Sequence, residues 1–254
     1  MKLTTVLAVL FLPVYLFAAP PPDTTIKGIQ VRFGYSAGIF PESWRAAPVS
    51  AQGEVIAAKE IERSTAIMLK ALNKYPFSVL QKNLTAVHFL KSMSFFEVGY
   101  GGTNSTDKVY LTNNGIPQGY TDAYLEQTFH HEFSSILLRN YLSQFDTTAW
   151  KAANDSKFSY NDPEDGVGAI RNNASSQELD TAICRRGLLT QYAMSGLEND
   201  MNTFAQNLFR PEKNFWTVVD KYPGIRKKTT LLIRFYNNLS PVFSEDYFRK
   251  FDKK

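Results

Sequence analysis

The residues most able to do chemistry lie in one run, Thr128–Leu138, with the sequence TFHHEFSSILL. In a His-Glu-x-x-His motif, two histidines four positions apart share one face of a helix and bind zinc, and the glutamate acts as general base on zinc-bound water. Here His131 and Glu132 occupy the first two positions, and Ser135 stands where the second histidine would be. A neutral hydroxyl is a poor zinc ligand beside imidazole or carboxylate, so the motif is half present.

Further candidates flank this run and follow it. His130 lies about 100° round a helix from His131 and four positions after Glu126, so it could pair with that carboxylate or share a metal with it. Downstream, Tyr192 could pack at a helix end, and Glu198 could be a first-turn acid that complements the helix dipole. Spacing alone leaves these alternatives open.

The histidine-glutamate helix, followed by Tyr192-Ala193 and an acidic helix start, resembles secreted zincin metallopeptidases of the gluzincin type. It looks still more like the zinc-binding metallopeptidases found among exported bacterial proteins, and the resemblance covers about residues 54–209. The resemblance implies a zincin-like fold, a zinc cofactor and a peptide or protein substrate. The roles that it implies are metal ligands for His131 and Glu198, with His130 as a further candidate, the catalytic base for Glu132 and the oxyanion donor for Tyr192.

Two departures from the family pattern concern the metal. Ser135 replaces the second histidine, and Asn199 occupies the seventh position after Tyr192, where the family has its third ligand. A catalytic zinc usually has three protein ligands, whereas His131 and Glu198 supply two. We therefore expect zinc to be weakly bound or absent, in an exported zincin-like protein with an eroded site and reduced or no peptidase activity. The alternative is a non-catalytic secreted binding protein that uses the former cleft for peptide or glycan ligands.

Composition excludes several other classes of protein. The chain has 254 residues, 44% of them hydrophobic, and can bury a sizeable core without cross-links. Its single cysteine, Cys184, excludes an intrachain disulfide, a cysteine-rich zinc module and an iron–sulfur cluster. The net charge is +4, and basic residues concentrate in 210–254, interleaved with apolar residues at helical spacing. We expect a solvated helix face there and no nucleic-acid partner.

The N-terminus predicts export. A basic start, the apolar run Leu3–Phe17 and the small residues after it are typical of a secretory signal peptide, which we place at residues 1–18. No cysteine lies near the cleavage site, so we do not expect a lipoprotein. No later segment is apolar for long enough to cross a membrane. We expect a secreted or periplasmic protein with an extended segment at 19–53 and one zincin-like domain at 54–254.

The elements that must position these residues follow from periodicity. Apolar residues at helical spacing mark the helices, and alternating β-prone residues mark the strands. The order of elements predicts the α+β class, in a single domain with a small mixed sheet, a long active-site helix and a mostly helical C-terminal half. The expected helices are 54–75, 121–142, 176–190, 198–209, 215–221 and 226–238, and the expected strands are 28–39, 84–90, 95–100 and 108–111.

Overall fold

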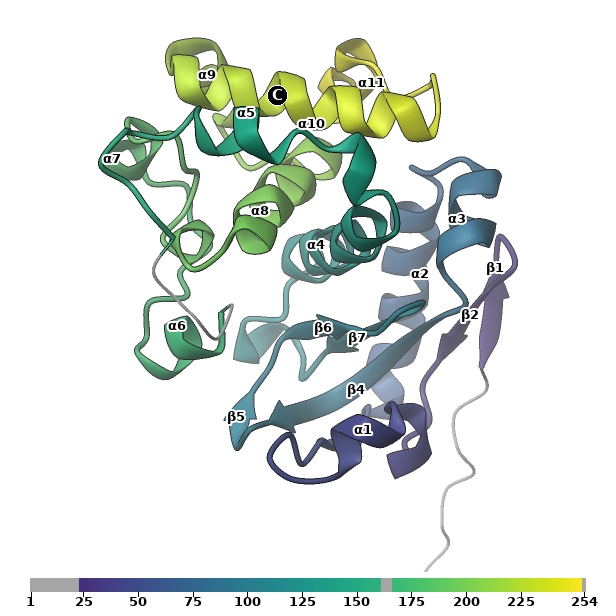
Figure 1. Cartoon of the computed structure of the whole chain (residues 1–254). Helices are drawn as coiled ribbons and strands as arrows, with labels where there is room; N and C mark the ends of the chain where they lie inside the picture. The colour runs from purple at the N-terminus through teal and green to yellow at the C-terminus, as the bar shows by residue number, and fades with distance from the viewer. Residues whose placement is uncertain (1–22, 161–165, 253–254) are drawn as a thin grey trace, which may run out of the picture.

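A computed structural model describes residues 23–160 and 166–252 of the chain. The expected signal peptide, residues 1–18, lies outside the described residues. In Figure 1 a sheet forms the lower part of the molecule, a long helix lies above it, and the helices of the C-terminal half cover that helix from the other side. The α+β class and the helical C-terminal half are therefore confirmed.

The sheet is mixed and has seven strands within the described residues. Its path is β1-β2-β4-β7-β6, with β2, β4 and β7 parallel, while β3 and β5 pair antiparallel with the far half of β4. β6 is therefore an edge strand of the described sheet. The strands are Thr24–Ile26 (β1), Ile29–Arg32 (β2), Gln52–Val55 (β3), Ala86–Phe95 (β4), Val98–Gly99 (β5), Gly102–Asn104 (β6) and Lys108–Thr112 (β7).

Helices make up most of the rest of the described chain. None of these described helices is both long and apolar enough to span a membrane. Short 3₁₀ turns connect several of these helices. One of the turns, Tyr192–Met194, comes just before the helix that begins at Leu197. The helices are Glu42–Arg45 (α1), Ile61–Leu72 (α2), Phe77–Asn83 (α3), Asp122–Asn140 (α4), Thr147–Lys151 (α5), Val167–Arg171 (α6), Thr181–Cys184 (α7), Leu197–Phe209 (α8), Phe215–Lys221 (α9), Pro223–Leu239 (α10) and Glu245–Arg249 (α11).

Helix α4 lies in the middle of the molecule. Thr121 caps it, because its Oγ1 accepts a hydrogen bond from the backbone N–H of Tyr124 at 3.2 Å. All residues from 125 to 138 are buried, since the sheet and α2 pack on one side of α4 and α8 packs on the other. A helix that is buried all round must satisfy its polar side chains within the protein. Most of the candidate residues lie on this helix.

Three segments differ from the sequence expectations. The helix expected at 54–75 begins only at Ile61, because residues 52–55 pair with β4 instead. The strands expected at 84–90 and 95–100 are replaced by the single strand β4, which turns into β5 through two residues with positive φ, Phe96 and Glu97. The helix expected at 176–190 is reduced to α7. The strands β1 and β2, which lie in the segment 19–53, and β3, which begins there, belong to the same sheet as β4.

Candidate functional site

A polar cleft of about 920 Å³ runs along one side of α4. Its other walls are residues 99–104, which include the edge strand β6, residues 175–179, and the N-terminal part of α8. The structure brings five of the sequence candidates to this cleft. They are His131, Glu132, Ser135, Tyr192 and Glu198.

The imidazole of His131 is held by helix α8. Its Nδ1 lies 2.9 Å from Oε1 of Gln206, and Asn199 lies against the same ring. The ring of Tyr192 stacks on the imidazole, with ring centroids 5.9 Å apart and an interplanar angle of 29°. Burial lowers the pKa of His131, so the imidazole is neutral at pH 7. Tyr192 therefore packs against the histidine at the cleft wall.

The hydroxyl of Ser135 is held in the same way. Its Oγ accepts a hydrogen bond from Nδ2 of Asn202 at 2.5 Å. Asn199, Asn202 and Gln206 are three and four positions apart, so they share the face of α8 that packs on α4. Three neutral amides of α8 thus face His131 and Ser135, which lie four positions apart like the two histidines of a His-Glu-x-x-His motif.

Glu132 is anchored from the edge strand. Its Oε2 accepts a hydrogen bond from Nδ2 of Asn104 at 2.6 Å. Burial, together with the nearby charge of Glu198, raises the pKa of Glu132 to about 7. A Cβ atom built on Gly102 would lie 2.8 Å from Oε1 of Glu132, so the glycine allows the backbone to approach this carboxyl closely. A carboxyl group with a pKa near 7 is suited to accepting or donating a proton at neutral pH.

The carboxylate of Glu198 pairs with Arg139 and not with His131. Its Oε1 accepts a hydrogen bond from Nη1 of Arg139 at 3.2 Å, and its side chain is 28% exposed. The same guanidinium group donates through Nη2 to the side-chain oxygen of Asn104. Glu198, Arg139, Asn104 and Glu132 therefore form one chain of polar contacts along the cleft wall.

His130 lies on the opposite side of α4 from the cleft. Its Nδ1 is 2.9 Å from the hydroxyl of Tyr75, and its ring stacks on Phe209 with centroids 4.8 Å apart. Its Nε2 is 3.9 Å from Oε1 of Glu126. Burial lowers the pKa of His130 to about 4, so the ring is neutral. His130 and Glu126 are thus neighbours at a separation too long for a hydrogen bond, at a place remote from His131 and Ser135.

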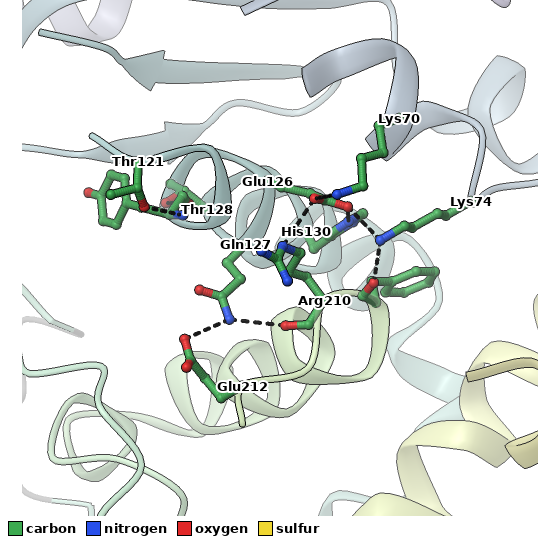
Figure 2. A network of polar contacts seen from close by, with 11 residues as sticks. Lys70, Lys74, Thr121, Glu126, Gln127, Thr128, His130, Arg210 and Glu212 are labelled. Atoms are coloured by element: carbon green, nitrogen blue, oxygen red, sulfur yellow. Dashed lines mark hydrogen bonds and ion pairs between the residues drawn. The ribbon is translucent and has the colours of Figure 1, made fainter. Parts of the chain in front are cut away.

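Glu126 is the centre of a separate ionic cluster (Figure 2). Its buried carboxylate accepts a hydrogen bond from Nζ of Lys70 at 2.8 Å and another from Nζ of Lys74, and it lies 3.2 Å from Nε of Arg210. Burial opposes ionisation, but the nearby imidazole of His130 and the hydrogen bonds from the two lysines hold the pKa of Glu126 well below its usual range. This cluster fastens the end of α8 to α2 and α4 and has no part in the cleft.

The donor set of the cleft does not fit zinc. The position of the second histidine holds a hydroxyl, the facing positions of α8 hold amides, and Glu198 is paired with Arg139. Soft or nitrogen ligands and carboxylates suit zinc, whereas neutral oxygens are poor substitutes. Within residues 23–160 and 166–252, no group of three or more His, Cys, Asp or Glu side chains is placed to hold a metal ion.

Sequence reasoning missed four side chains that shape the site. Asn202 and Gln206 contact the motif residues directly, and Asn104 and Arg139 join Glu132 to Glu198. The amides of α8 left a partial signal, because Asn199, Asn202 and Gln206 recur at helical spacing between the apolar residues of the helix. The contact of Asn104 depends on the placement of β6 beside α4 and has no local signal.

The chain was also compared with known proteins. No protein-family model matches it, and no curated protein matches it. A solved structure from Bacteroides caccae, described as "a putative zinc-binding metallo-peptidase", is similar with a TM-score of 0.47 and 17% sequence identity. The similarity covers 74% of this chain and 75% of that chain.

Proposed function

We propose that this chain is an exported zincin-like protein whose cleft binds an extended peptide and whose zinc site is eroded. The observation that carries the proposal is the pairing of His131 with Gln206 and of Ser135 with Asn202. Both motif positions are therefore engaged by neutral amides of α8. A cleft with this donor set binds its ligand through hydrogen bonds and charge, and we expect no zinc-dependent hydrolysis of peptide bonds.

The edge strand supports a peptide as the ligand. The backbone groups of Gly101 and Ser105 are hydrogen-bonded to β7. Because the pattern of an antiparallel pair alternates, the backbone groups of Gly102 and Asn104 point away from β7. An extended peptide can add to such an edge through main-chain hydrogen bonds, with its side chains in the neighbouring cleft.

Zinc content tests the metal half of the proposal. The protein is incubated with excess zinc, desalted and measured by inductively coupled plasma mass spectrometry. We expect far less than one zinc ion per wild-type chain, and we expect the Ser135→His/Asn199→Glu variant to gain zinc because it regains two ligands. The matched control is Ser143→His/Asn73→Glu, which adds the same residue types at exposed positions.

Each zinc result decides something. Tight, stoichiometric zinc in the wild-type protein would contradict the eroded site. Zinc in the restored variant alone supports it, and a restored variant that is folded by circular dichroism but binds no zinc counts against the zincin-like ancestry.

Peptide binding tests the other half. Fluorescein-labelled random hexapeptides should bind the wild-type protein in an anisotropy assay. The same library with alternate backbone amides N-methylated should bind more weakly, because it lacks the donors needed to pair with β6. Equal binding of both libraries would argue against strand addition, and no binding of either would refute the peptide ligand.

A further inference from the structure

We propose that the cleft selects a cationic peptide with basic side chains on alternate residues, an inference that rests on the proposed function and narrows it. Carboxyl groups dominate the charged lining that the described residues give the cleft: Glu132, Glu178, Glu198 and Glu212 stand beside one ammonium group, that of Lys213. The chain as a whole has a net charge of +4. The acidic character is thus local to the cleft, and such a cleft attracts cationic ligands and repels anionic ones.

Two of the four carboxyl groups, those of Glu178 and Glu212, are exposed and form no ion pair within the described chain. Glu198 is paired with Arg139. Glu132 also lines the cleft, is 9% exposed, and accepts one hydrogen bond, from Asn104 on Oε2. An ammonium or guanidinium group in the cleft can donate to the other oxygen and favours the ionised carboxylate.

The direction of β6 relative to α4 determines the path of a peptide that pairs with this edge strand. A Cβ atom built on Gly101 would meet the hydroxyl of Tyr124, and one built on Gly102 would meet Thr128 and Glu132. β6 therefore advances along α4 in the direction of the helix, and a peptide added to β6 follows α4 as well. The stretch of α4 that lines the cleft, residues 121–135, is about 21 Å long, which is the length of about six extended residues.

The spacing of the carboxylates along this path gives the pattern of basic residues. Gln127 holds Glu212 through a hydrogen bond of 3.0 Å from its Nε2. Glu132 lies five residues further along α4, or about 7.5 Å along the helix axis. In an extended peptide, alternate side chains point to the same side and lie about 6.6 Å apart. Basic side chains two residues apart therefore match the rise along α4 between Gln127, which holds Glu212, and Glu132, and Glu178 lines the same cleft.

Labelled hexapeptides of defined charge test the inference. The probes are KTKTKT, QTQTQT and ETETET, together with KKKTTT, which has the same charge as the first but a different spacing. We expect the affinity to fall in the order KTKTKT, KKKTTT, QTQTQT, ETETET. The Glu178→Gln/Glu212→Gln variant should weaken KTKTKT by about tenfold, since a partly exposed ion pair contributes about two- to fivefold, and should weaken the uncharged QTQTQT by much less.

The matched control is Glu42→Gln/Glu62→Gln, which removes two exposed carboxylates away from the cleft. An equal loss of KTKTKT binding in this control would show bulk attraction and would overturn the inference. QTQTQT binding as tightly as KTKTKT would also overturn it, while leaving peptide binding itself intact. If no probe of any charge binds, the proposed function fails as well. About 1 M salt should reduce the difference between the probes, because the Debye length is then about 3 Å.

Discussion

Replacing Lys228 by methionine should destabilise the protein strongly. The side chains of Lys228 on α10 and Asp200 on α8 are both fully buried, and Nζ of Lys228 donates to Oδ2 of Asp200. The same oxygen accepts hydrogen bonds from Nε1 of Trp150 at 2.8 Å and from the hydroxyl of Tyr160 at 2.6 Å. Methionine keeps most of the length of the side chain, so the substitution removes charge more than volume.

The expected loss of stability follows from leaving the buried carboxylate of Asp200 without its cation. Removing one partner of a buried pair costs about 3–5 kcal/mol. Because two other donors still hold Asp200, we expect a loss of about 3 kcal/mol in the free energy of unfolding at pH 7. Burial raises the pKa of Asp200, and loss of the ammonium group raises it further. A carboxyl whose folded pKa lies above its unfolded value, about 3.9, loses stability as the pH rises between the two, by up to about 1.4 kcal/mol per unit.

Urea unfolding at pH 5 and pH 7, followed by tryptophan fluorescence and circular dichroism, measures this effect. The variants are Lys228→Met, Asp200→Asn and their combination, with Lys227→Met as a control at an exposed neighbour. The loss for Lys228→Met should be smaller at pH 5 than at pH 7, and the double variant should lose less than the sum of the single ones. A loss within about 1 kcal/mol of the control, or one that is the same at both pH values, would refute the reasoning.

Three further predictions concern α4 and its contacts. Because the depressed pKa of Glu126 gives stability that is present above its unfolded pKa and lost as the pH falls, Glu126→Gln should lower the melting temperature at pH 7 and flatten its decrease between pH 5 and pH 3. Gly102→Ala should displace Glu132, whose Oε1 lies 2.8 Å from the added Cβ, and weaken hexapeptide binding, whereas Gly34→Ala, outside the cleft and with nothing within 4 Å, should not. Thr121→Ala removes the cap of α4 and should cost about 1 kcal/mol in urea unfolding.

The sequence predicted helices best where an apolar pattern at helical spacing extends over several turns. The long helix expected at 121–142 is α4, Asp122–Asn140, and the helices expected at 198–209 and 215–221 are α8 and α9 within one residue. Each has an apolar pattern over two or more turns and a clear stop. The segment 176–190 has a similar apolar content but forms only the single turn α7, because Asp180 caps a turn that ends before Gly187 at φ +87°. Tertiary contacts decide such short segments, and local pattern does not.

The site was predictable to the extent that it lies on helices. The spacing of His131 and Ser135 places them on one face of α4, and the structure shows both at the cleft. The partners on α8 follow from how two buried helices face each other, which spacing within one helix does not specify. For the same reason His130, adjacent in sequence to His131, points to Tyr75 and Glu126 on the other side.

The amides that face α4 from α8 all suit a cleft that holds no cation. Without a cation, a carboxylate at position 199 would lie against the neutral ring of His131, close to Glu132 and Glu198, in a buried setting where an unpaired charge is costly. An amide at that position adds no charge and still has hydrogen-bonding groups. Asn202 likewise adds no charge, and its amide donates a hydrogen bond to the hydroxyl of Ser135, which can accept one. Building a tight zinc site here therefore requires exchange of residues on both helices, and Ser135→His alone should fail to create one.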